Sequence, residues 1–421
     1  MSAKQSQSLT VITIVAMMFL YAMISFVTNL AAPVGKIWGE SFTNPAQAER
    51  MGMLGNLFNF LAYLIMGIPA GNLLAKYGYK KTALTAIVIG ACGMAVQWLS
   101  GPLSSFAVYL IGALLGGFCV CMLNTVVNPM LNLLGGGGNR GNQLNMIGGT
   151  INSLTSSLTP MLVGALIGES LAGKTIMDVS MLLLMAIGVF AIVYCVLLIV
   201  PFAEPAGAGQ KVTYERSPWA FRHLTLGVIA IFIYVGIEIG VPATLISYLD
   251  KGVDLGYDDA TFIASLYWLL MLGGRIIGSL IGGKVSSRAM VVCVSIAAIA
   301  LMGTAMLLGN GVTMQMPTSW AFEMETVPVA ALLLILVGLC TSVMWTSIFN
   351  MATEGLGKYT AKASGIFMMM VVGGGVIPYI QSTVAGHNYL LSYLVPVAGV
   401  AYILYYALWG SKNVNTDIPT E

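Results

Sequence analysis

Apolar residues are gathered into long stretches along this chain, and short polar segments separate them. A helix needs about 20 mostly apolar residues to cross a bilayer. Twelve stretches meet that length, at residues 10–34, 51–74, 82–100, 105–134, 144–168, 179–201, 223–249, 260–283, 289–308, 328–353, 362–386 and 389–410. The pattern therefore predicts an all-α membrane protein with twelve transmembrane helices.

The composition agrees with this class. Of the 421 residues, 58% are apolar and 8% are charged, whereas soluble domains carry about 25% charged residues. Most of the surface is therefore expected to face membrane lipids. All six cysteines fall inside apolar stretches and lack the spacing of a metal site. No basic cluster is interleaved with exposed aromatic residues, so no nucleic-acid partner is expected.

The positions of the basic residues predict the orientation. If the N-terminus is cytoplasmic, most of the 18 lysine and arginine residues fall in cytoplasmic segments. The outer segments then hold only Lys36, Arg50, Lys174 and Lys251. Membrane proteins concentrate lysine and arginine on the cytoplasmic side, and a wrong helix count would break this alternation. Both termini are therefore expected to be cytoplasmic.

The longest charged interruption, 202–222, lies close to the middle of the chain. It predicts an N-terminal six-helix bundle (1–201), a cytoplasmic linker (202–222) and a C-terminal six-helix bundle (223–421). A faint repeat supports two pseudo-symmetric halves. Asn124-Thr125 follows Gly117, and Trp345-Thr346 follows Gly338, at the same spacing.

Several enzyme and pump motifs are missing. The glycine run 135–138 lacks the G-K-[ST] ending of a phosphate loop and follows a membrane helix. A pump powered by ATP within this chain is therefore not expected, and transport by this membrane protein is expected to be secondary or passive. The only histidines, His223 and His387, lie at helix margins, and no H-E-x-x-H occurs. No enzymatic activity is expected. The alternatives to a transporter, which come from other functional classes, are a membrane-embedded enzyme and a sugar-sensing receptor.

Two ionisable residues lie well inside predicted helices, Glu238 and Arg275. A charge in the bilayer is costly unless it faces a cavity or a partner, so each is a candidate functional residue. Glu238 is expected to bind substrate hydroxyls, to carry a coupling proton or to supply oxygen ligands to sodium. A neutral structural acid is the alternative. Arg275, nearer the cytoplasmic end, is expected to form a gate or scaffold contact more than a direct substrate contact.

Neutral polar residues form a second group of candidates. Amides offer both donors and acceptors, which suits a polyhydroxylated neutral solute. Aromatic rings can stack on the apolar face of a sugar. For each residue, interhelical hydrogen bonding or interfacial anchoring is the alternative role. The amides are Asn29, Asn56, Asn59, Asn124, Asn128, Asn145, Asn152 and Gln381, and the aromatic residues are Tyr234, Trp268, Trp345 and Tyr379.

The segment from Gly71 to Lys81 resembles the G-x-L-a-D-r-x-G-r-k signature of the major facilitator superfamily. Ala75 stands where that signature has an aspartate. The resemblance implies the major facilitator fold and a conformational role for Gly71 and Lys80.

Further segments resemble the fucose/glucose/galactose permease family of bacterial sugar symporters. They span most of the chain in order: Pro69-Ala70-Gly71, Asn124-Thr125-Val126-Val127-Asn128-Pro129, Leu144-Asn145 with Asn152-Ser153, Tyr234-Val235-Gly236-Ile237-Glu238, Gly274-Arg275-Ile276-Ile277-Gly278, Trp345-Thr346-Ser347-Ile348-Phe349, and Glu354 through to Pro378. The resemblance implies a central monosaccharide site and cation-coupled uptake. It also implies carboxylates at two positions that hold Asn29 and Asn124 here. Because an amide does not titrate, proton coupling through these two positions is absent. The acid that glucose- and galactose-type relatives carry in the helix matching 223–249 is retained as Glu238.

These features together predict a secondary transporter that imports a monosaccharide, a hexose or deoxyhexose, by cation-coupled symport and alternating access. Facilitated uniport, or export of small hydrophobic compounds, is the alternative. Glu238 is the candidate for coupling to H⁺ or Na⁺, and no other cofactor is expected. A monomer in the inner membrane of a bacterium is expected. The predicted substrate-binding residues are Asn29, Asn124, Asn128, Asn152, Glu238, Trp345 and Gln381, and the predicted gating residues are Gly71, Lys80 and Arg275.

Overall fold

The computed structural model describes residues 3–40, 45–167, 175–204, 213–415 and 417–420. The first half holds α1 (Ala3–Glu40), α2 (Pro45–Ser100), α3 (Phe106–Leu134), α4 (Gly138–Ile167) and α5 (Ser180–Ile199). The second half holds α6 (Arg222–Ser247), α7 (Tyr257–Ile281), α8 (Ser287–Leu308), α9 (Val329–Thr341), α10 (Met344–Thr353), α11 (Thr360–Met369), α12 (Gly373–Ala385) and α13 (Leu394–Tyr405). Strands β1 (Thr313–Pro317) and β2 (Met324–Pro328) pair as an antiparallel hairpin between α8 and α9.

The helix count of the prediction is recovered once the kinks are taken into account. Among the described residues, ten helices are long and apolar enough to cross a membrane. One of them, Leu57–Ser100, has 44 residues, about twice the length that one crossing needs, so we count it as two crossings. Its two parts meet at Gly78, whose φ of 81° lies in the region that favours glycine. Helix α4 adds the remaining crossing, and the all-α fold with twelve crossings is confirmed.

Two crossings are broken near their middles. Helices α9 and α10 are separated at Ser342 and Val343, and α11 and α12 are joined by a 3₁₀ turn at Met370–Val372. The sequence pattern predicted continuous helices at 328–353 and 362–386. Broken membrane helices free backbone groups, which are tolerated where they are buried in protein or line a cavity.

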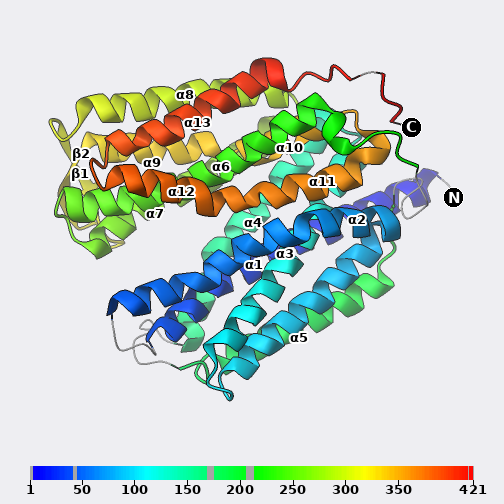
Figure 1. Ribbon diagram of the computed structural model, residues 1–421, viewed down its shortest axis with the longest axis horizontal. Helices are drawn as coiled ribbons and strands as arrows, with labels where there is room; N and C mark the ends of the chain where they lie inside the picture. The colour runs from blue at the N-terminus through cyan, green and yellow to red at the C-terminus, as the bar shows by residue number, and fades with distance from the viewer. Residues whose placement is uncertain (1–2, 41–44, 168–174, 205–212, 416, 421) are drawn as a thin grey trace.

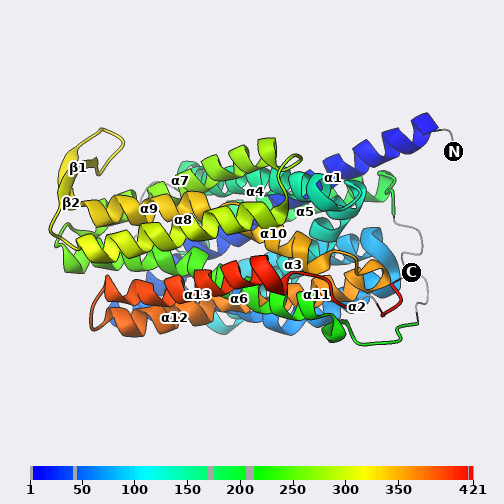
Figure 2. The same ribbon diagram turned by 90° about the horizontal axis from the view of Figure 1, so that it is seen from above.

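The helices form two groups that lie side by side (Figure 1). Helices α1 to α5 make one group, hereafter the N-bundle, and α6 to α13 make the other, the C-bundle. Both chain termini lie at one end of the molecule, here called the terminal end, and the β1–β2 hairpin lies at the opposite end (Figure 2). The limits 1–201, 202–222 and 223–421 stay a prediction, and residues 205–212 of the predicted linker lie outside the described part.

The two bundles meet closely toward the terminal end. Helix α2 packs on α11 through Gly67, Gly71 and Gly365, and a Cβ atom on Gly365 would lie 2.4 Å from the Gly67 carbonyl oxygen. Hydrogen bonds across the interface join Gln143 Nε2 to the Ser279 carbonyl at 2.9 Å and Asn142 Nδ2 to Ser347 Oγ at 3.3 Å. Because the residues of both bonds lie near the terminal ends of their helices, these contacts close the interface on that side.

Candidate substrate site

A cavity of about 390 Å³ lies between the two bundles. Its volume falls within the range of about 300–1,000 Å³ that is usual for small-molecule sites. The N-bundle contributes polar side chains from α1 to α4, and the C-bundle contributes side chains from α6, α7 and the two broken crossings. The polar and aromatic lining residues are Tyr21, Ser25, Thr28, Asn29, Asn59, Phe60, Tyr63, Asn124, Asn152, Ser156, Glu238, Trp268, Arg275, Ser342, Trp345 and Thr346.

One face of α1 forms a wall of this cavity. Tyr21, Ser25 and Asn29 are spaced by four residues, which places them on the same side of the helix. Ser25 Oγ lies 2.7 Å from Ser156 Oγ on α4, and Asn29 Nδ2 donates to the same oxygen at 3.0 Å. Asn152 Nδ2 donates to the Tyr21 carbonyl at 3.1 Å. The two helices are therefore cross-linked by polar groups on the side that faces the cavity.

Asn128 connects the two bundles beside the cavity. Its Oδ1 atom accepts hydrogen bonds from Tyr21 Oη at 2.7 Å and from Trp345 Nε1, across the interface, at 3.2 Å. Its Nδ2 atom donates to the Asn124 carbonyl at 2.9 Å. Asn128 is fully buried and does not line the cavity, whereas Asn124 does line it and donates to Tyr63 Oη at 2.9 Å.

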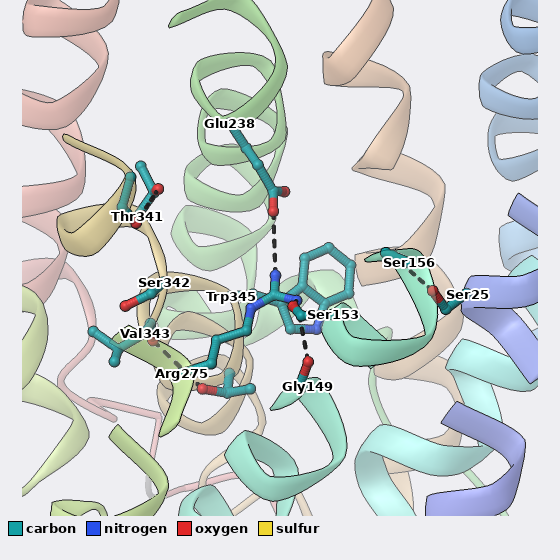
Figure 3. A network of polar contacts seen from close by, with 12 residues as sticks. Ser25, Gly149, Ser153, Ser156, Glu238, Arg275, Thr341, Ser342, Val343 and Trp345 are labelled. Atoms are coloured by element: carbon teal, nitrogen blue, oxygen red, sulfur yellow. Dashed lines mark hydrogen bonds and ion pairs between the residues drawn. The ribbon is translucent and has the colours of Figure 1, made fainter. Parts of the chain in front are cut away.

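Glu238 and Arg275 form an ion pair inside the cavity (Figure 3). Arg275 Nη2 lies 3.3 Å from Glu238 Oε1, and the two side chains are 14% and 15% exposed. Arg275 Nη1 also donates to Ser153 Oγ at 2.5 Å and to the Gly149 carbonyl at 3.2 Å. Arg275 was expected nearer the cytoplasmic end, as a gate or scaffold contact. The structure places it in the cavity wall, and its bonds to α4 join α7 to that helix, so the gate or scaffold role stays a prediction.

The other candidates are divided between the cavity and its surroundings. Asn29, Asn124, Asn152, Glu238 and Trp345 line the cavity. Gln381 is fully buried beside Gly240 on α6 and is not among the lining residues. Gly71 lies in the contact between α2 and α11. Lys80 lies outside the cavity, where its Nζ atom donates to the carbonyls of Leu198 and Val200 at 3.0 and 2.8 Å.

Of the four aromatic residues predicted to stack on a sugar, two line the cavity and two do not. Trp268 and Trp345 line the cavity, whereas Tyr234 is fully buried with its ring centroid 6.3 Å from that of Trp345. Tyr379 is 74% exposed and lies outside the lining. Asn145 is buried and donates to the Asn128 carbonyl at 3.1 Å, so it supports the wall.

Several polar residues of the site were not singled out from the sequence. Tyr21, Ser25, Tyr63 and Ser156 line the cavity, and Ser153 holds Arg275. The four-residue spacing of Tyr21, Ser25 and Asn29 was a usable signal, because it places three polar groups on one face of a membrane helix. Ser153 carries no such signal, since hydroxyls commonly bond to their own helix.

The arrangement suits reversible binding of a polar solute. Within the described residues, no three His, Cys, Asp or Glu side chains gather in a way that would hold a metal ion. The cavity instead offers amides, hydroxyls, indole rings and one ion pair, at the junction of two membrane-embedded bundles. This combination defines a multi-pass membrane carrier with a central site.

Comparison with known families agrees with that class. A sequence model of the Major Facilitator Superfamily matches residues 14–378. The chain therefore belongs to the Major Facilitator Superfamily, whose members are transporters and not enzymes.

Individual relatives are similar over nearly the whole chain. The glucose/galactose transporter of Brucella abortus is 28% identical over 433 residues, which cover 98% of this chain and 96% of that protein. The L-fucose-proton symporter of Escherichia coli is 21% identical, over 94% of this chain and 92% of that protein. A crystal structure of the E. coli fucose:proton symporter superposes with a TM-score of 0.80 at 19% identity, covering 96% of this chain and all of the other. At that identity the superposition shows the fold alone.

Proposed function

We propose that this protein imports a neutral monosaccharide by alternating access, with cation-coupled symport as its mode. The names of the relatives support a sugar as the substrate, because they are a glucose/galactose transporter and an L-fucose-proton symporter. The observation that carries the proposal is the central cavity, in which amides, hydroxyls and two indole rings from both bundles converge. Amide groups match sugar hydroxyls as both donors and acceptors.

The ion pair supports a substrate without net charge. Glu238 and Arg275 neutralise each other within the cavity. A sugar acid, a sugar phosphate or an amino sugar would add an unpaired charge to a partly desolvated site, which is costly. A neutral hexose or deoxyhexose adds only hydroxyls, which either side chain can bind. The amides, hydroxyls and ion pair in the lining argue against an exporter of small hydrophobic compounds.

The closed terminal end fits the loading step of an importer. Lysine and arginine are concentrated in the segments at that end, which favours a cytoplasmic location. The bundles are in contact there, so with this proposed orientation the site would be shut toward the cytoplasm. A substrate would then enter from the outside and leave after the bundles rock apart at the terminal end.

Glu238 is the proposed coupling residue. It is the acidic side chain that lines the cavity, and its carboxylate can take up a proton or contribute oxygen ligands to Na⁺. Asn29 and Asn124 also line the cavity but cannot titrate. We place the protein in the inner membrane of a bacterium and expect it to act as a monomer.

Facilitated sugar uniport is the second candidate function. The observation that favours it is the contact with Arg275, which already gives Glu238 a cationic partner. A carrier with this internal counter-charge has less need of an external cation. The sugar site is the same in both candidates, and only the response to ion gradients differs.

Purified protein in proteoliposomes tests the proposal. Uptake of radiolabelled glucose, galactose, fucose, glucuronate and glucosamine would be measured without a gradient, with an inward proton gradient and with an inward sodium gradient. Accumulation of one neutral sugar, driven by one of the gradients, is the expected result. Sugar flux that ignores both gradients would mean uniport. If vesicles that contain folded protein transported none of the sugars, the substrate assignment would be wrong.

A further inference from the structure

We infer that Arg275 is a ligand-sensitive clasp between the two bundles, and that Ser153 and the Gly149 carbonyl are its anchor on α4. The inference rests on the proposed function, since it concerns how occupancy of the sugar site controls the movement of the bundles. Its test uses a conformational measurement that needs no sugar, so that the two proposals can fail separately.

The guanidinium group spans the interface. Arg275 belongs to α7 of the C-bundle, and one of its terminal nitrogens is held within that bundle by Glu238 at 3.3 Å. The other nitrogen donates to Ser153 Oγ at 2.5 Å and to the Gly149 carbonyl at 3.2 Å, both on α4 of the N-bundle. Figure 3 shows the guanidinium between the Glu238 carboxylate on one side and Ser153 with Gly149 on the other. One side chain therefore ties α6 and α7 to α4.

The clasp opposes separation of the bundles while the site is empty. Helices α4 and α7 must move apart when the terminal end opens, which breaks both bonds from Arg275 Nη1 to α4. Hydrogen bonds to a charged group are stronger than those between neutral groups, and a buried charged donor left without an acceptor is penalised further. An empty carrier would have to give up both of these acceptors before water from the opened side could replace them.

A sugar removes this obstacle because it brings acceptors of its own. Arg275 and Gly149 both line the cavity, so a ligand hydroxyl can approach the guanidinium. Glu238 can at the same time accept hydrogen bonds from ligand hydroxyls. The loaded carrier then exchanges protein acceptors for sugar oxygens as it opens, whereas the empty carrier loses them. A ligand can shift a conformational equilibrium only if it interacts differently with the two conformations, and the sugar does so here by replacing the acceptors that Arg275 loses on opening.

The position of Arg275 distinguishes this contact from others across the interface. The bond from Gln143 to the Ser279 carbonyl also joins α4 to α7, but neither residue lines the cavity. The bond from Trp345 to Asn128 involves a cavity residue but no charge. Arg275 alone among these donors is charged, touches the cavity and bonds to the opposite bundle.

The test removes the anchor without touching the ligand surface. Ser153 is not among the lining residues, so Ser153→Ala deletes one acceptor of Arg275 and leaves the cavity wall intact. Alanine is also the better helix former, so the variant is expected to fold. Ser157→Ala is the matched control, because Ser157 lies one turn further along α4 and its hydroxyl bonds only to the Ser153 carbonyl among the interactions described. Ser153→Thr keeps the hydroxyl and should behave as the wild type.

Bundle separation would be read from electron–electron spin distances in lipid nanodiscs. Spin labels at Arg140→Cys and Lys284→Cys flank the contact of α4 with α7 at the terminal end. The background carries alanine at the exposed cysteines Cys92, Cys195 and Cys293. In the absence of sugar, Ser153→Ala should raise the ratio of separated to closed bundles by about tenfold, the effect of one charge-assisted hydrogen bond. Ser157→Ala and Ser153→Thr should leave the ratio unchanged.

Rates of sugar flux provide a second, independent test. In the wild type, sugar exchange should be much faster than net efflux into sugar-free medium. Exchange uses only the loaded carrier, whereas net efflux requires the carrier to return empty. In Ser153→Ala the two rates should converge. Distances in Ser153→Ala equal to those of the wild type would overturn the clasp, whether or not a sugar is transported. A shift in distances without any sugar flux would retain the clasp and reject the sugar.

Discussion

The side chains of Glu238 and Arg275 meet across 3.3 Å between α6 and α7, in the wall of a cavity at the centre of the membrane-spanning bundle. These are the two ionisable residues that the hydropathy pattern places well inside predicted helices. Their pairing explains how both are tolerated there, since each supplies the counter-charge of the other. It also places the candidate coupling group next to a group that bonds to the opposite bundle, and the predictions below follow from that contact.

Glu238→Gln should abolish gradient-driven accumulation and leave equilibrium exchange in place. The amide keeps the shape of the side chain and an oxygen that can accept from Arg275, but it cannot take up a proton or balance a sodium ion. Sugar should therefore rise only to the outside concentration in proteoliposomes. Glu215→Gln, a change at an exposed position of the segment before α6, is the control and should accumulate sugar normally. Full accumulation by Glu238→Gln would remove this residue from coupling.

Neutralising one partner of the ion pair should destabilise the protein more than neutralising both partners. Arg275→Gln leaves the largely buried Glu238 carboxylate without its cation. Loss of one partner of a fully buried pair costs about 3–5 kcal/mol, which is an upper limit for a pair whose side chains are 14% and 15% exposed. The double variant Glu238→Gln/Arg275→Gln has no buried charge and should recover much of that loss. The midpoint of thermal unfolding in detergent measures both. Equal destabilisation of the single and double variants would mean that the charge pairing does not govern stability here.

Gly365→Ala should push α2 and α11 apart at the terminal end. The added Cβ atom would lie 2.4 Å from the Gly67 carbonyl oxygen and 2.7 Å from the Gly71 Cα atom, both of which are backbone atoms that cannot rotate away. Such overpacking typically costs about 1–3 kcal/mol, and the closed interface should be weakened. We expect a lower melting temperature and slower uptake.

Gly375→Ala provides the matched control for that change. Gly375 lies in α12, and an added Cβ atom there meets no other atom within 4 Å. The same substitution should therefore be neutral, or slightly stabilising because alanine favours the helix. If Gly365→Ala behaved like Gly375→Ala in both melting and uptake, the close packing of α2 on α11 would not be needed for the transport cycle.

Tyr21 and Asn128 should be energetically coupled. Asn128→Leu removes the acceptor of Trp345 and the nearer of two acceptors of Tyr21, whose hydroxyl keeps Asn145 Oδ1 at 3.3 Å. The change should destabilise the protein by about 1–3 kcal/mol, since it leaves the buried indole N–H without its partner. Tyr21→Phe should lower the free energy of unfolding by about 1 kcal/mol, the contribution of one hydrogen bond. In the double variant the total should be smaller than the sum of the two, as expected for residues in one network. Additive shifts in chemical unfolding would show that the bond contributes little.

Much of the architecture follows from local properties of the chain. The need for about 20 apolar residues per crossing is a length rule, so it predicts the twelve crossings without knowledge of packing. The breaks at Ser342 and Val343 and at Met370–Val372 were not predicted. Neither break contains a proline, and each depends on which neighbours surround the freed backbone groups.

The site was predicted in part for a similar reason. Polar residues are costly against lipid, so Asn29, Asn124, Asn152 and Glu238 were expected to face the interior, and all four line the cavity. Trp345, expected as an aromatic stacking partner, lines it too. Asn128 and Gln381 meet the same rule without lining it, because the interior also contains helix contacts away from the cavity. A polar residue in a membrane helix indicates an interior face, but it does not distinguish a substrate contact from an interhelical bond.

The sequence by itself determined the class of the protein, the number of crossings and the small set of groups able to carry charge within the membrane. These are consequences of transfer free energy, which each segment has on its own. Only the tertiary structure decided that Arg275 faces Glu238 within its own bundle and Ser153 across the interface. Those partners depend on the rotation and depth of three helices relative to one another, and a shift of one residue along any of them would separate the atoms.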